Sequence, residues 1–186
     1  MKQQLFTKER INLLWDVLTL NSRFYEHSQR HPQLVKIAQI VVFLAAIAHA
    51  LGSILIPLLA QLSVPLIFLI FLLNALIVIL GYYLWTYTIC QMGKWLKLPI
   101  PSYRELLAPI GFAYFPQILN FLTVIPLLGR PIEITLATWT LLATIVAINQ
   151  GLNIKLKWTI FICLPIWLLV QIAIGIVQIL MNWVIV

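Results

Sequence analysis

His49 is the only histidine inside a long apolar stretch of the chain, where it stands between Ala48 and Ala50. Such an imidazole can serve as the axial ligand of a haem or chlorophyll, and the small neighbours, together with Gly52, leave room for the ring. The simpler alternative is a neutral histidine that hydrogen-bonds to a neighbouring helix. Apart from this tetrapyrrole alternative, we expect no cofactor other than bound lipids.

Two further histidines, His27 and His31, are four residues apart, a spacing that can hold a metal ion on one helix face. Pro32 follows directly and no third ligand is evident, so we predict no metal site. The sequence has no phosphate-binding loop, zinc signature or dinucleotide fingerprint, and no evident histidine-activated nucleophile. We find no charged side chain inside the apolar stretches, which argues against proton-coupled transport and intramembrane hydrolysis. We therefore predict that the protein is not an enzyme.

Four polar or small residues near the C-terminus share one helix face, with spacings of i, i+4, i+7 and i+11: Gln171, Gly175, Gln178 and Asn182. In lipid, such a stripe supports close helix packing and hydrogen bonds between helices. Candidate partners within the chain are Asn74, Asn120 and Asn149. The alternative is a lateral interface with another protein.

The composition of the chain places these residues in a membrane. Hydrophobic residues make up 62% of the 186 residues and charged residues 9%, against about 45–50% and about 25% in soluble domains. A chain of this kind cannot cover a surface that faces water. The net charge of +7 does not indicate a nucleic-acid partner, because the charges lie at the ends of apolar stretches and form no basic face. These observations predict an all-α integral membrane protein.

Five apolar stretches are long enough to cross a bilayer, which takes about 20 helical residues. They cover approximately residues 37–59, 65–91, 106–128, 132–150 and 158–184. We therefore divide the chain into a cytoplasmic segment, residues 1–33, and a five-transmembrane-helix bundle, residues 34–186. Gln61–Ser63 and Gly129–Pro131 are expected to form tight turns between neighbouring spans.

The distribution of Lys and Arg predicts the orientation of the bundle. Eleven of these 12 residues lie in the N-terminal segment, at the start of the first span, or in the second and fourth connections, whereas Arg130 lies in the third. Connections in the cytoplasm carry the excess of positive charge. The N-terminus is therefore expected in the cytoplasm and the C-terminus outside.

Residues 8–28 are predicted to form an amphipathic helix, or a pair of helices. Polar residues share one arc of the helical wheel, and the opposite arc is anchored by Ile11, Leu14, Trp15 and Leu18. A helix with one strongly apolar and one charged face lies in the membrane interface. Such a helix is either a platform for a partner or a helix packed flat on the end of the bundle.

The third apolar stretch carries an unusual motif, in which Gly111, Phe112 and Tyr114 stand between Pro109 and Pro116. Prolines remove backbone donors and kink membrane helices, so this span is expected to form a hinge, an internal cavity or a static kink. The motif resembles the Gly-aromatic-small-x-x-Pro pattern of the Ypt-interacting-protein (Yip/Yif) family. Further similarity lies in Ile125–Pro126, Tyr103–Leu106, Trp139 and Ala147–Gly151.

The resemblance implies a five-span membrane protein without catalysis, in the short form of bacterial or organellar members, and hence a bacterial inner or thylakoid membrane. Eukaryotic members are tied to Rab-type GTPases and carry a longer soluble N-terminal region; this sequence lacks that region, which makes a GTPase partner doubtful. We expect a scaffold or assembly factor that contacts lipids and other integral membrane proteins in a larger complex. The alternatives are a subunit of a pigment or haem complex, with His49 as ligand, and a small-molecule facilitator.

Overall fold

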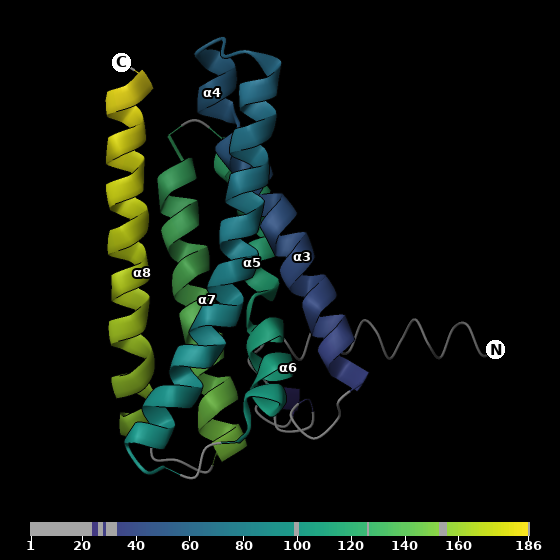
Figure 1. Ribbon diagram of the computed structural model, residues 1–186, viewed down its shortest axis with the longest axis vertical. Helices are drawn as coiled ribbons and strands as arrows, with labels where there is room; N and C mark the ends of the chain where they lie inside the picture. The colour runs from purple at the N-terminus through teal and green to yellow at the C-terminus, as the bar shows by residue number, and fades with distance from the viewer. Residues whose placement is uncertain are drawn as a thin grey trace, which may run out of the picture.

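The computed structural model describes Phe24, Tyr25, Ser28 and residues 33–98, 101–125, 127–152 and 156–185. Within these ranges the chain forms helices and turns and no strand, which confirms the all-α prediction. The elements are α3 (Gln33–Ser53), α4 (Leu55–Leu59), α5 (Val64–Trp95), α6 (Tyr103–Ala113), the 3-10 helix η1 (Phe115–Val124), α7 (Gly129–Leu152) and α8 (Leu156–Ile185). Figure 1 shows α8 and α7 running lengthwise beside each other, whereas α5 and α3 slope in opposite directions.

Each of the five predicted stretches is helical, because a backbone in lipid must satisfy its polar groups within the segment. In the described part of the chain, three helical segments are long and apolar enough to cross a membrane: Leu34–Leu59, Val64–Trp95 and Gly129–Asn149. A fourth is added if α6 and η1, which are bent by 41° against each other, count as one span. In α8 the described apolar part, Leu156–Leu169, is shorter than these spans.

Side-chain size on α3 shows how the bundle is packed. Its buried face is built from small residues, namely Ala38, Ala45, Ala46, Ala48 and Ala50, whereas its exposed face carries Ile37, Ile40, Phe43 and Leu44. A water-soluble helix would have the opposite arrangement. Small residues let membrane helices approach one another, and large apolar side chains face lipid. The structure is therefore that of a helical membrane protein.

The third span is broken in the middle, as its prolines predict. Pro109 lies inside α6, and Pro116 lies in the first turn of η1. The backbone then stays in the 3-10 form for 10 residues, although 3-10 segments longer than about four residues are uncommon. A neighbouring helix supplies one polar group near the break, since the hydroxyl of Tyr82 on α5 donates to the carbonyl oxygen of Leu107 at 2.7 Å.

The third connection differs from the prediction. Gly129, Arg130 and Pro131 form the first turn of α7 and no tight turn. The chain reverses just before them, where Leu127 has a φ of 67°. Proline is tolerated in the first helical turn, where its missing N–H has no intrahelical partner to lose. The turn predicted near Gln61 is present between α4 and α5, and Gln61 itself has a φ of 53°.

The last part of the N-terminal segment packs on the bundle. Phe24, Tyr25 and Ser28 are buried, and the ring of Phe24 meets the ring of Phe112 on α6 at a centroid distance of 5.0 Å. Burial raises the pKa of the Tyr25 phenol well above its ordinary value, so this side chain stays uncharged at physiological pH. The predicted anchor residues Ile11, Leu14, Trp15 and Leu18, like His27 and His31, lie outside the described residues.

Candidate functional site: a polar network inside the bundle

His49 meets an amide from the broken span. Nδ1 of His49 on α3 lies 3.4 Å from Nδ2 of Asn120 on η1. Asn120 is 2% exposed, and His49 is half-buried. His49 therefore lies beside a polar group of a neighbouring helix, as the simpler expectation has it, and its role as a tetrapyrrole ligand stays a prediction. An ionisable side chain in such a position is a default candidate for function in a membrane protein.

The network continues from Asn120 to α7. Nδ2 of Asn120 donates to Oε1 of Gln117 in a short hydrogen bond. Nε2 of Gln117 donates to the hydroxyl of Thr140 at 2.9 Å, and that hydroxyl donates in turn to the carbonyl oxygen of Leu136 at 2.9 Å. A chain of hydrogen bonds therefore joins α3, η1 and α7 across the bundle.

The 3-10 form of η1 aligns the polar residues of this network. With three residues per turn, side chains at i and i+3 lie directly above one another. Gln117, Asn120 and Thr123 follow this spacing and form one polar line on an otherwise apolar helix. Gly52 lets α3 approach this line, because a Cβ at Gly52 would lie only 2.6 Å from the carbonyl oxygen of Asn120.

A charged pair lies in the span that carries Thr140. Glu133 belongs to the second turn of α7, and its carboxylate pairs with Arg130 at 2.8 Å. Glu133 also acts electrostatically on His49. The expectation that no charged residue lies inside the spans was therefore wrong. The predicted fourth span, residues 132–150, already contains Glu133.

Sequence reasoning missed Gln117 and Thr140 as members of the site. The signal for Gln117 was visible, because Gln117, Asn120 and Thr123 are the polar residues of the apolar stretch after Pro116 and are spaced three positions apart. What the sequence could not supply was the pairing, since His49 and Asn120 are 71 residues apart.

The motif residues of the third span lie at helix contacts. A Cβ at Gly111 would lie 2.9 Å from the Cβ of Ala38, so the missing side chain lets α3 and α6 approach closely. Phe112 contacts Phe24, the ring of Tyr114 packs against Tyr82 at 5.8 Å, and Pro116 starts η1. The motif therefore positions the N-terminal segment, α3 and α5 around the broken span.

The predicted stripe near the C-terminus is placed only in part. Gln171, Gly175, Gln178 and Asn182 all belong to α8, but among their side chains only that of Gln171 is described, and it is half-buried. Two of its candidate partners are engaged elsewhere: Asn74 donates to the carbonyl oxygen of Ile70, and Asn120 belongs to the network with His49. The stripe as an interface stays a prediction.

The fold and the site together define a helical integral membrane protein with a buried polar network at a broken span. No group of three or more His, Cys, Asp or Glu that could hold a metal ion is present among the described residues. Comparison with protein-family models, curated proteins and solved structures finds no match to this chain.

Proposed function

We propose that this protein is a five-span, non-enzymatic membrane scaffold or assembly factor of the Yip type, which acts by contacting lipids and helices of other integral membrane proteins. The observation that carries this proposal is the exposure of α5. No residue in the most apolar 18-residue window of this helix is buried. We refer to the exposed large side chains of its first half as the α5 face: Val64, Leu66, Phe68, Leu69, Leu72, Leu73, Leu76, Ile77 and Leu80.

The proposed occupant of the α5 face is a transmembrane helix of another protein. Asn74 stands within this face, is half-buried, and donates to the carbonyl oxygen of Ile70 in its own helix, at 2.8 Å. A polar amide on a helix that meets lipid is the kind of group that joins membrane helices. A partner helix against the α5 face would shield Asn74 from lipid and accept or donate a further hydrogen bond.

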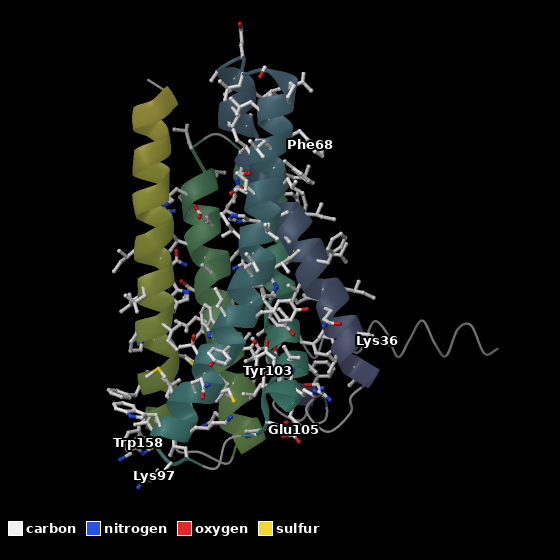
Figure 2. The ribbon with its side chains drawn as sticks, viewed as in Figure 1. Lys36, Phe68, Lys97, Tyr103, Glu105 and Trp158 are labelled. Carbon is white, nitrogen blue, oxygen red and sulfur yellow. The ribbon has the colours of Figure 1, made fainter. Side chains whose placement is uncertain are left out.

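The proposed orientation has the N-terminus in the cytoplasm and the C-terminus outside, and the resemblance to the short Yip-type members favours a bacterial inner or thylakoid membrane. The arrangement of cations supports it: Lys97 lies beside Trp158 at one end of the molecule and Lys36 lies in the same half, whereas Phe68 lies toward the other end (Figure 2). Positive charges are typical of the cytoplasmic membrane boundary, and aromatic rings are typical of both boundaries. The α5 face then lies in the outer half of the bilayer.

A photo-crosslinking experiment in native membranes tests the proposal. A photoreactive residue at Ile77, one helical turn from Asn74, is expected to capture another integral membrane protein. The matched control is Phe161 on α8, because the two side chains are equally exposed, at 55% and 57%. Phe161 is expected to capture lipid. Lipid adducts alone at both positions would reject a protein partner on the α5 face. Visible absorption of the purified complex would instead support the tetrapyrrole alternative.

A further inference from the structure

The Asn120 side chain has one hydrogen-bonding group in use and one unused. Its Nδ2 engages both Gln117 and His49. Its Oδ1 is buried and has no hydrogen-bond partner among the residues that the structure describes. A buried carbonyl oxygen without a donor is costly, and such groups in native proteins call for an explanation. The amide that contacts the imidazole therefore also carries a hydrogen-bond acceptor that is not in use.

The roles of donor and acceptor between Asn120 and His49 depend on the tautomer of the histidine. With Nδ2 of Asn120 toward the ring, Nδ1 of His49 is the acceptor and the imidazole hydrogen lies on Nε2. The opposite orientation of the amide would bring Oδ1 of Asn120 against Oε1 of Gln117, which are two acceptors. The observed arrangement therefore belongs to a neutral His49.

A proton on Nδ1 of His49 reverses these preferences. Two donors would then face each other. Half a turn of the Asn120 amide brings Oδ1 round to accept from Nδ1–H, while Nδ2 takes the buried position that Oδ1 had. Gln117 must turn with it, so that its Nε2 donates to Asn120 and its Oε1 accepts from Thr140. The hydroxyl of Thr140 is able to follow, because it now donates to the carbonyl oxygen of Leu136. The network thus has two arrangements that differ by one proton.

We propose that His49, Asn120 and Gln117 form a proton-binding site inside the bundle, in which uptake of one proton at Nδ1 of His49 turns both amides together. The proton comes from water and stays on the imidazole, so the site gains one positive charge and one N–H bond. The expectation that the spans exclude proton chemistry was based on an absence of charged residues that Glu133 contradicts. The proton site stands independently of the proposed scaffold role.

Two effects act on a charge at His49. Burial of the imidazole opposes the charged form, and the carboxylate of Glu133 on α7, which is paired with Arg130, acts in the other direction. No titratable side chain occurs in η1 or α4. Tyr83 bonds to Gln39, which is about 15 Å along α3 from His49. The remaining titratable residues of α3, α5, α6 and the bend are Lys36, Tyr82, Tyr87, Cys90, Lys94, Tyr103, Arg104, Glu105 and Tyr114.

Nuclear magnetic resonance of the full-length protein in lipid nanodiscs tests the proposal. Nitrogen-15 is introduced into imidazole and side-chain amide groups, and H49Q identifies the signals of His49. We expect the neutral imidazole to carry its hydrogen on Nε2. On acidification, Nδ1 should become protonated while the amide signals of Asn120 and Gln117 shift with the same midpoint. A hydrogen on Nδ1 in the neutral form, or amide signals that do not follow His49, would overturn the proposal.

Variants at two asparagines separate the site from general effects on the bundle. N120L removes the Oδ1 acceptor that would bind the protonated imidazole. We expect the proton affinity of His49 to fall by about tenfold or more, because one charge-assisted hydrogen bond to the protonated form is lost. N74L is the matched control, because Asn74 bonds within its own helix and should leave His49 unchanged. An unaltered His49 titration in folded N120L would contradict the proposal. If N120L does not fold, the titration of the wild-type amides decides the question.

Discussion

Gly111 is the position at which an added methyl group should most directly disturb the bundle. In G111A the new Cβ would lie 2.9 Å from the Cβ of Ala38, about 0.6 Å inside the roughly 3.5 Å at which carbon atoms come to rest. The carbonyl oxygen and carbon of Ala38 are also close, at 3.2 and 3.3 Å. Because these are backbone atoms, no side chain can rotate away, and α3 must separate from α6.

The expected cost of G111A follows from this geometry. Overpacking a buried contact costs about 1–3 kcal/mol of unfolding free energy. The gain in helix propensity from glycine to alanine, about 1 kcal/mol in water, should largely cancel, because membrane helices stay helical when they separate in the membrane. We therefore expect a net loss of about 1–3 kcal/mol.

G81A provides the matched control for this experiment. Gly81 is also a helical glycine, on α5, but a Cβ there would meet nothing within 4 Å. Its substitution should change the unfolding free energy by less than about 0.5 kcal/mol. Reversible unfolding in mixed detergent micelles measures both variants. Equal stabilities of G111A and G81A would refute the close approach of α3 and α6.

Two further predictions concern the ends of the bundle. F24A should release the N-terminal segment and raise its rate of proteolysis at least about tenfold, since truncating a buried Phe typically costs about 3–5 kcal/mol. F43A is the control and should leave this rate unchanged, because the Phe43 ring is 56% exposed. Equal rates of proteolysis in F24A and F43A would contradict the docking of Phe24 on α6. For the orientation, an impermeant thiol reagent outside the cell should label Q61C and leave K97C unlabelled, against a low background because Cys90 and Cys163 are buried. The reverse pattern would invert the proposed topology.

The positions of the helices were predictable because the length of each apolar stretch largely decides them. Helix formation in a membrane follows from the length of an apolar stretch, and each of the five predicted stretches is helical in the structure. The error in the third connection has a local cause. Gly129 and Pro131 are typical of turns, yet Pro131 suits a first helical turn and Gly129 is needed for space, because a Cβ there would meet the carbonyl oxygen of Thr123.

The polar network was less accessible to sequence reasoning because it depends on which helices are neighbours. His49 was singled out from the sequence. Asn120, however, was considered only as a candidate partner of the polar stripe on α8, on the basis of its residue type. The 3-10 form of η1 decides the outcome, since it aligns Gln117 with Asn120 and turns both toward their partners on α3 and α7. Proline content indicated a break in the span without indicating that the following turns would tighten.

The length of α5 has a consequence for the membrane itself. Its 32 residues extend about 48 Å, against a hydrocarbon core of about 30 Å. The charged residue Lys94 comes only in the last turn, so nearly the whole length is uncharged. A tilt of about 40°, the upper limit for membrane helices, still leaves about 37 Å along the bilayer normal. The surrounding bilayer must thicken or the ends must protrude, and this hydrophobic mismatch should draw the protein toward the thickest membrane regions of the cell.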